Sequence, residues 1–272
     1  MTFSILKLYE IFEKETPIIG VDHLEPLPGS PLYKGDFSSV IERAIKDAST
    51  LEDGGVDGII IENFGDIPYW PRVTEPETIA AMAIIVREVS REVSIPIGVS
   101  FLRNSAVEAL AIAHVCGAKF IRVNAYVENV STDSGIIEAA APAVIRYAKK
   151  LGAKIGVLAD VHVKHASPLG ERHLKDVISD AFGRGLATAV ILTGSKTGEP
   201  PSKKDLLLAK GLRKGPILIG SGLSLETIEL LKYADGAIVG TFFKKEGNVH
   251  NPVDVNRVKK FINAAKEYLR KH

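Results

Sequence analysis

Polar and glycine residues follow eight short apolar runs of this chain, at the point where each run stops. The runs have the length of β-strands, and the residues after them donate or accept hydrogen bonds or leave the backbone exposed. Acids, bases and amides in such a set suit proton transfer and the binding of a polar ligand. The residues are His23, Glu62, Asn63, Arg103, Arg122, Asn124, Asp160, His162, Lys164, Thr193, Gly220, Ser221, Gly222, Gly240 and Thr241.

Three of these residues, Asp160, His162 and Lys164, are two positions apart at the end of one run. Side chains along a strand alternate between its two faces, so we expect the three to share a face. Glu62 supplies a second carboxylate, and neighbouring charges tune pKa values for acid/base work. The pattern therefore predicts that Asp160, His162, Lys164 and Glu62 are catalytic.

The same charges have a structural alternative. A charge deep in a protein is costly unless it is paired, so Asp160–Lys164 or Glu62–Arg122 ion pairs could simply brace the site. We favour the catalytic interpretation because a brace has little need of a histidine such as His162.

Glycines after the seventh and eighth runs predict a phosphate site. Gly220-Ser221-Gly222 follows the seventh run, and Gly240-Thr241 follows the eighth. In eight-stranded α/β barrels these two loops commonly hold phosphate. A helix expected near Ser224 would point its positive end at the same place. The chain has no Gly-rich loop ending in Gly-Lys-Ser or Gly-Lys-Thr, which argues against a P-loop nucleotide hydrolase.

Other polar residues of the set are candidates for substrate contacts, and some of them could also bind a metal ion or form a Schiff base. Besides the glycine loops, we expect substrate contacts from His23, Asn63, Arg103, Arg122, Asn124 and Thr193. His23, Glu62, Asp160 and His162 could ligate a divalent metal ion, but their spacing is not diagnostic, and we assign neither a metal site nor a cofactor. Lys164 could form a Schiff base with a carbonyl substrate, although lysines pair more often with carboxylate or phosphate.

The elements that position these residues alternate between strands and helices. We expect strands near 18–23, 58–62, 97–102, 119–124, 154–160, 188–193, 216–220 and 236–240. We expect helices near 36–53, 75–92, 104–116, 134–150, 172–184, 202–213, 224–232 and 252–270. Connections that leave strands are longer than those that enter them, and long connections are commonly functional. Eight such units favour a single (β/α)8 TIM barrel over residues 17–272 rather than an open doubly wound sheet.

Residues 1–16 precede the first strand and have an apolar, helix-like pattern from Ile5 to Phe12. We expect an N-terminal extension helix there, packed against the barrel or a partner subunit. Because its apolar face needs a surface to cover, we also predict a homo-oligomer.

The composition is typical of a soluble globular protein. In 272 residues, 34 Lys and Arg balance 33 Asp and Glu to a net charge of +1, so nothing indicates a nucleic-acid partner. The single cysteine, Cys116, excludes a disulfide framework. No secretory segment and no apolar run of about 20 residues is present, so we expect a cytoplasmic location, with peripheral membrane association left open. Glutamine is absent and methionine is rare, as in thermophilic proteins.

Longer motifs cover the same regions. They include GVDHLEPLPGSP from Gly20, DGIIIENFGD from Asp57, ADVHVKHA from Ala159 and DGAIVGT from Asp235. Over residues 17 to about 262 the chain resembles the BtpA family, also called BtpA/SgcQ. Asp22 and Glu25 stand where we expect a hydrophobic residue and a proline in the opening signature of that family.

The resemblance implies a TIM-type barrel. The family is named for a cyanobacterial role in photosystem I accumulation, and some relatives carry enzyme labels such as nucleotide hydrolysis. We predict an enzyme that acts on a small phosphorylated metabolite, a sugar phosphate or a nucleotide-derived phosphate, by acid/base chemistry as a lyase, isomerase or hydrolase. The alternative is a non-catalytic assembly or stability factor for a membrane complex, which has little use for ionisable residues in a barrel mouth.

Overall fold

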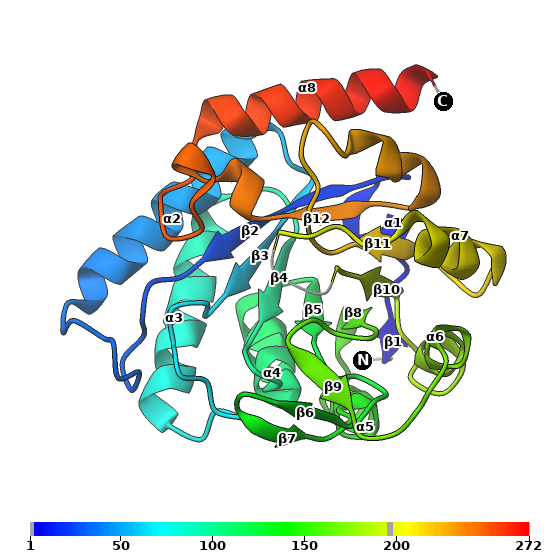
Figure 1. Cartoon of the computed structure of the whole chain (residues 1–272). Helices are drawn as coiled ribbons and strands as arrows, with labels where there is room; N and C mark the ends of the chain where they lie inside the picture. The colour runs from blue at the N-terminus through cyan, green and yellow to red at the C-terminus, as the bar shows by residue number, and fades with distance from the viewer. Residues whose placement is uncertain (1–2, 195–197, 272) are drawn as a thin grey trace.

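Eight parallel strands form a closed barrel at the centre of the molecule. The computed structural model describes residues 3–194 and 198–271. The barrel strands are β2 (Ile18–His23), β3 (Gly58–Glu62), β4 (Ile97–Ser100), β5 (Phe120–Val123), β8 (Lys154–Asp160), β10 (Ala189–Leu192), β11 (Ile217–Ile219) and β12 (Ala237–Val239). The ring is complete because β12 pairs with β2 and β5 pairs with β8 (Figure 1). The predicted (β/α)8 barrel is confirmed.

An outer layer of helices covers the barrel. It consists of α2 (Phe37–Gly54), α3 (Pro76–Glu92), α4 (Ala106–Cys116), α5 (Ala141–Leu151), α6 (Leu174–Gly183), α7 (Lys203–Gly211), the 3-10 helix η1 (Ile228–Tyr233) and α8 (Val255–Lys271). Polar caps set two of the starts: Asp36 accepts from the backbone N–H of Ser39 at 3.1 Å, and Ser202 accepts from that of Asp205 at 3.1 Å. Such caps satisfy N–H groups that have no partner inside the helix.

The helix expected from residue 134 begins later than predicted. The chain first forms a hairpin of β6 (Val130–Thr132) and β7 (Gly135–Ile137), and β9 (Ala166–Pro168) pairs with β6 as a third strand. Gly135 has a φ of +101°, a conformation that favours glycine and breaks a right-handed helix. The expectation for residues 134–140 was therefore wrong, and α5 starts at Ala141.

The helix expected over residues 224–232 is also different. Its first turn is replaced by an irregular turn, and only η1 follows. The Thr227 hydroxyl accepts from the backbone N–H of Ser224 at 3.0 Å and donates to the carbonyl of Gly222 at 2.8 Å. A hydroxyl bonded in this way competes with the helical pattern of backbone hydrogen bonds. No α-helix therefore starts at Ser224.

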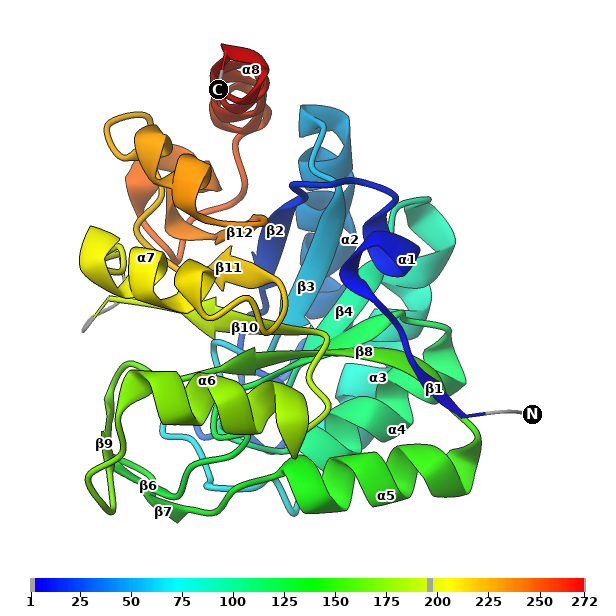
Figure 2. The same ribbon diagram turned by 90° about the vertical axis from the view of Figure 1, so that its right-hand side faces the viewer.

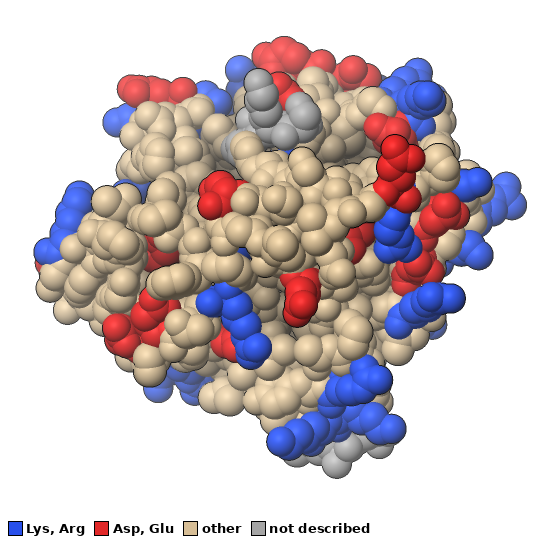
Figure 3. Space-filling model, turned by 60° about the horizontal axis from the view of Figure 1, so that its bottom comes forward, with Lys and Arg blue, Asp and Glu red and all other residues tan. Residues whose placement is uncertain are grey.

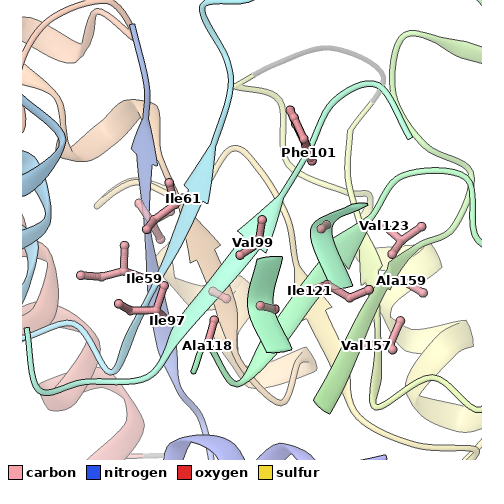
Figure 4. Packing of buried hydrophobic residues seen from close by; sticks show 14 of the residues in the cluster. Ile59, Ile61, Ile97, Val99, Phe101, Ala118, Ile121, Val123, Val157 and Ala159 are labelled. Carbon is pink, nitrogen blue, oxygen red and sulfur yellow. The ribbon is translucent and has the colours of Figure 1, made fainter. Parts of the chain in front are cut away.

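Side chains of the barrel strands alternate between two apolar layers. Those that face outward pack beneath the helices in one large cluster, which includes Ile59, Ile61, Val99, Ile121 and Val157 (Figure 4). Those that face inward form a second cluster inside the barrel, which includes Ile19, Ile60, Phe120, Leu158 and Ile191. The next inward positions, at the carboxyl ends of the strands, are polar, and they begin the candidate site.

The amino-terminal residues close the other end of the barrel. β1 (Ser4–Ile5) pairs with β8, and the short helix α1 (Leu8–Phe12) follows. Leu8, Ile11 and Phe12 are buried in the inner cluster of the barrel. Figure 2 shows α1 at the end of the barrel away from β6, β7 and β9.

The helix is thus shorter than the expected span from Ile5 to Phe12, because Ile5 belongs to β1. Its apolar face already covers a surface of the same chain. The N-terminal pattern therefore no longer argues for a homo-oligomer, which stays a prediction.

The surface carries charges of both signs. Figure 3 shows a face on which basic and acidic side chains are interspersed with uncharged surface. This mixture agrees with the net charge of +1. Among the helices described, none is both long and apolar enough to cross a membrane.

A candidate active site at the mouth of the barrel

A cavity of about 860 Å³ opens at the carboxyl ends of the barrel strands. Most of the residues singled out from the sequence line it: His23, Glu62, Arg103, Arg122, Asn124, Lys164, Gly220, Ser221, Gly222, Gly240 and Thr241. Asn63, Asp160, His162 and Thr193 are not among its lining residues. The strand-end pattern therefore located the cavity, but it did not decide which side chains enter it.

The loops after β11 and β12 form one wall of the cavity. Gly222, Leu223 and Gly240 line it, and their backbone N–H groups have no hydrogen-bond acceptor within the described part of the chain. Gly222 has a φ of +72°, and a Cβ there would lie 2.0 Å from the backbone nitrogen of Pro200. Only glycine fits such a position. Backbone donors that are close and unoccupied suit the binding of an anion.

Arg257, at the start of α8, adds a positive charge beside these loops. Its side chain lines the cavity, and its Nε donates to the carbonyl of Phe242 at 2.7 Å. The guanidinium carbon also lies 4.7 Å from the centre of the Phe242 ring. These contacts hold the cation against the loop that carries Thr241. Sequence reasoning missed Arg257 because it follows a helix start and not a strand.

A buried ion pair lies beneath the opposite wall. Arg122 donates to Asp160 through Nε at 3.0 Å and through Nη2 at 3.2 Å, and Asn124 donates to the same carboxylate at 2.8 Å. Burial disfavours the cation, but Asp160 and Glu62 together raise the pKa of Arg122. Asp160 thus braces the site, as in the structural alternative, although its partner is Arg122 and not Lys164.

Glu62 and His23 bring an acid and an imidazole to the cavity. The Glu62 carboxylate accepts from the Ser100 hydroxyl at 2.8 Å and lies 3.7 Å from Nη1 of Arg122. Nε2 of His23 is 3.9 Å from Glu62 Oε1. Burial, followed by the charges of Lys244, Lys164 and Arg122, holds the pKa of His23 well below its usual range. The imidazole is therefore neutral near pH 7.

Lys164 reaches the cavity from the loop after β8. Its Nζ has no carboxylate oxygen of the described residues within 4 Å. Burial, and then the charge of Arg122, lowers the pKa of Lys164, while Glu62 and Asp160 oppose this effect. The ammonium form is thus less favoured than that of an ordinary surface lysine.

His162 lies outside the cavity. Its backbone N–H donates to Glu128 at 2.9 Å, and its Nε2 lies 3.2 Å from the carbonyl oxygen of Arg172. The expectation that His162 shares a face with Asp160 and Lys164 was wrong. β8 ends at Asp160 and His162 has a φ of +48°, so the two-residue alternation of an extended strand no longer applies.

Asn63 and Thr193 are also placed away from the cavity lining. The Asn63 side chain accepts from the backbone N–H of Leu102 at 2.6 Å and donates to Asp66 at 2.9 Å, so its amide is occupied by the protein. The Thr193 hydroxyl is buried and has no hydrogen-bond partner among the described residues. Ser221 lines the cavity, but its hydroxyl donates to the carbonyl of Glu199 at 2.6 Å and thereby holds the neighbouring loop.

Arg103 and Tyr69 form the rim near the β6–β7 hairpin. Nη2 of Arg103 donates to Asp133 at 2.8 Å, and the guanidinium lies over the Tyr69 ring at 5.3 Å. Tyr69 and Asp133 also line the cavity. Neither was predicted from the sequence, because Tyr69 lies in a long loop and Asp133 in the turn between β6 and β7, where no periodic pattern marks an inward position.

The metal hypothesis finds little support in this arrangement. Among the described residues, no group of three or more His, Cys, Asp or Glu side chains is placed to hold a metal ion. Of the four suggested ligands, His162 lies outside the cavity and Asp160 is occupied by Arg122 and Asn124. We therefore derive no chemistry through a metal at these residues.

A closed (β/α)8 barrel with a polar cavity at its carboxyl end defines the class of this protein, and its sequence defines the family. The BtpA family model matches residues 14–267, and the chain belongs to that family. An uncharacterized protein of Thermococcus kodakarensis is 46% identical over 94% of this chain and 97% of its own length. The photosystem I biogenesis protein BtpA of a Synechocystis species is 44% identical over 97% and 93%.

Solved structures are similar in fold alone. N-(5'-phosphoribosyl)anthranilate isomerase from Pyrococcus furiosus superposes with a TM-score of 0.55 at 14% identity, over 93% of this chain and 99% of that one. At such low identity the similarity extends to the barrel architecture and not to individual residues.

Proposed function

We propose that this protein is an enzyme that acts on a small phosphorylated metabolite, a sugar phosphate or a nucleotide-derived phosphate, by acid/base chemistry. One observation carries the proposal: a single cavity joins a wall of free backbone donors to a wall of ionisable side chains. The glycine loops and Arg257 would bind the phosphate, and the other wall would act on the rest of the molecule. The phosphoribosyl group in the name of the Pyrococcus isomerase is in keeping with a phosphorylated substrate for this barrel.

The geometry suggests a role for each ionisable residue. Glu62 and Lys164 would transfer protons, because both line the cavity. Neutral His23 would donate or accept a hydrogen bond, and Arg103 would stabilise negative charge. Asp160 would act indirectly by fixing the guanidinium of Arg122. We assign no role to His162.

Phosphate-dependent thermal stability tests this proposal. Inorganic phosphate and ribose 5-phosphate should raise the melting temperature, while ribose should not. A ligand at about 100 times its dissociation constant stabilises a protein by about 2.7 kcal/mol. The Arg257→Gln variant should lose most of this effect. Arg270→Gln changes an exposed arginine on the same helix and should respond like the parent protein.

Two outcomes would count against the site. If neither phosphate compound stabilises the parent protein, the loops do not bind phosphate. If Arg257→Gln responds as strongly as Arg270→Gln, the phosphate binds elsewhere. A wider screen of phosphorylated metabolites, with and without divalent metal ions, would then identify the substrate class.

A role as an assembly factor is the second candidate, and the named Synechocystis relative favours it. A partner would need an exposed surface, and the chain exposes large apolar side chains that include Leu32, Trp70, Ile136 and Leu169. Such a factor, or a homo-oligomer, would bury some of them. The mass in solution by light scattering tests the homo-oligomer, and binding of phosphorylated metabolites would favour the enzyme.

A further inference from the structure

Two arginines of the cavity have acidic partners, whereas the described residues offer none to the amine of Lys164. Arg122 is paired with Asp160 at 3.0 Å, and Arg103 is paired with Asp133 at 2.8 Å. No carboxylate oxygen of the described residues lies within 4 Å of Lys164 Nζ. Asp160 and Asp133 are thus occupied by arginines, and Lys164 forms an ion pair with neither of them.

The surroundings of Lys164 also make its neutral amine more accessible than that of a surface lysine. Burial, and then the positive charge of Arg122, lower its pKa, and the charges of Glu62 and Asp160 oppose this shift without reversing it. A neutral amine is a nucleophile, whereas an ammonium group is not. An ion pair with a carboxylate would hold the lysine in its charged form, and no carboxylate oxygen of the described residues lies within 4 Å of Nζ.

We propose that Lys164 forms a Schiff base with the substrate, and that the substrate is therefore a phosphorylated aldehyde or ketone. The inference rests on the proposed function, because the phosphate wall of the same cavity would hold the substrate while its carbonyl carbon meets Nζ. It narrows the substrate class from phosphorylated metabolites in general to those with a carbonyl group.

The step balances without any further reactant. The lone pair of Nζ adds to the carbonyl carbon, and one proton passes from nitrogen to oxygen to give a carbinolamine. A second proton, taken up at the hydroxyl, lets it leave as water and produces a positively charged imine. Glu62, which lines the cavity, is placed to carry these protons.

The imine draws electrons from the adjacent bond, so a neighbouring C–H or C–C bond can break. Loss of the C–H proton to a base gives a neutral enamine, and return of a proton to the other face of that carbon regenerates the imine as an isomer. Loss of a carbon fragment as a carbonyl compound, with its hydroxyl proton passing to the base, also leaves an enamine, which takes up a proton at carbon to regenerate the imine of a lyase product. Water then adds to the imine, releases the product and restores the Lys164 amine. Both reactions belong to the classes expected from the sequence.

Reductive trapping with pyridoxal 5'-phosphate, a phosphorylated aldehyde, tests the inference. The parent protein is treated with this probe and then with borohydride, which reduces an imine to a stable amine, and the labelled lysine is identified by peptide mass spectrometry. Labelling of Lys164 should exceed that of exposed Lys175 by about tenfold or more, because the cavity would hold the phosphorylated probe beside Nζ. The lowered pKa of Lys164 should act in the same direction. Its rate should rise with pH around a midpoint below the ordinary lysine value of 10.5.

Four controls accompany the test. Lys164→Arg keeps the charge and should abolish labelling at this position, while Lys175→Arg should leave it intact. Inorganic phosphate should slow the labelling, and pyridoxal without phosphate should label more slowly. Because mapping of the parent protein is sufficient, the result does not depend on the folding of either variant.

The outcomes separate the inference from the proposed function. If phosphate stabilises the protein but the label spreads over exposed lysines and spares Lys164, the Schiff base is wrong and the phosphate site stands. If Lys164 is labelled selectively but phosphate neither protects it nor stabilises the protein, the reactive amine stands and the phosphate site is wrong.

Discussion

At the scale of single residues, Asp160 is the residue whose contacts differ most from its predicted catalytic role. Its carboxylate accepts from two nitrogens of Arg122 and from Asn124, so few lone pairs remain for proton transfer. His162, by contrast, is partly exposed and contacts Glu128 and the backbone of Arg172. The two residues are neighbours in sequence but belong to different environments.

Removing each side chain should therefore have different effects on stability. Asp160→Ala leaves Arg122 as a buried charge without its main partner and should lower the free energy of unfolding by about 3–5 kcal/mol. His162→Ala removes peripheral contacts and should cost about 1 kcal/mol or less. Urea unfolding of both variants measures the difference. Equal losses would show that Asp160 is not a brace.

Asp22 is a second notable residue, because its carboxyl group is ionisable but lies in the protein interior. It is buried, and one carboxylate oxygen has no hydrogen-bond partner among the described residues. Nearby, the fully buried Lys244 pairs with Asp47 at 3.2 Å. Burial raises the pKa of Asp22 to about 8, with Lys244 opposing the shift and Asp47 adding to it. Asp22 is therefore largely protonated in the folded protein at neutral pH.

The stability of the protein should depend on pH through this group. The folded-state pKa of about 8 exceeds the ordinary 3.8, so the contribution of Asp22 is complete below about pH 4 and is lost as the pH rises through 8. Asp22→Asn cannot lose this proton. It should be more stable than the parent by roughly 2–5 kcal/mol at pH 9, with a smaller gap at pH 5.

Urea unfolding at the two pH values measures the gap. The exposed Asp53→Asn serves as the matched control and should show no such dependence. An advantage of Asp22→Asn that does not grow with pH would contradict the raised pKa.

At the scale of elements, α1 has a structural role that its sequence left open. Its apolar residues enter the barrel from the end opposite the cavity, and two strand glycines leave space for them. A Cβ on Gly156 would lie 2.3 Å from Cδ1 of Ile11, and a Cβ on Gly58 would lie 2.5 Å from the Phe12 ring. The helix and the strands are thus fitted to each other.

Paired substitutions test this fit. Gly156→Ala alone should destabilise the protein by about 1–3 kcal/mol through overpacking. Ile11→Ala alone should cost about 2–5 kcal/mol through the cavity it leaves. Together they should cost clearly less than the sum, because the new methyl group occupies the space that Ile11 vacates. Additive losses in urea unfolding would show that the two positions are not in contact.

Element positions were predictable where the apolar pattern was continuous. The expected strand at 18–23 coincides with β2, and the one at 154–160 coincides with β8. Parallel strands that are buried on both faces have largely continuous apolar sequences, which makes them easy to recognise. The errors fell at residues 134–140 and 224–227, where side-chain hydroxyls and a glycine with positive φ redirect the chain. Such local hydrogen bonds are not visible in hydrophobic periodicity.

At the scale of the whole molecule, closure of the barrel brings strand ends that are distant in sequence together in one site. His23 and Glu62 are 39 residues apart in the sequence but lie side by side, because β2 and β3 pair in register. Arg122 and Asp160 meet diagonally across β5 and β8, because Arg122 is in register with Leu158 and Asp160 lies two residues further along β8. The eight-stranded fold and the position of the cavity thus follow from the order and spacing of apolar runs, which the sequence displays directly.

The tertiary structure alone decided which side chains enter that cavity. Beyond the last paired residue of a strand, the direction of a side chain depends on backbone dihedrals and on distant partners. For this reason Lys164 faces the cavity while His162, two residues earlier, binds Glu128 outside it. Arg257 joins the site from a helix start more than 200 residues after His23. The sequence by itself determined the scaffold and the end of the barrel that carries the cavity. The tertiary structure decided the pairing of charges, which leaves Lys164 without an acidic partner among the described residues.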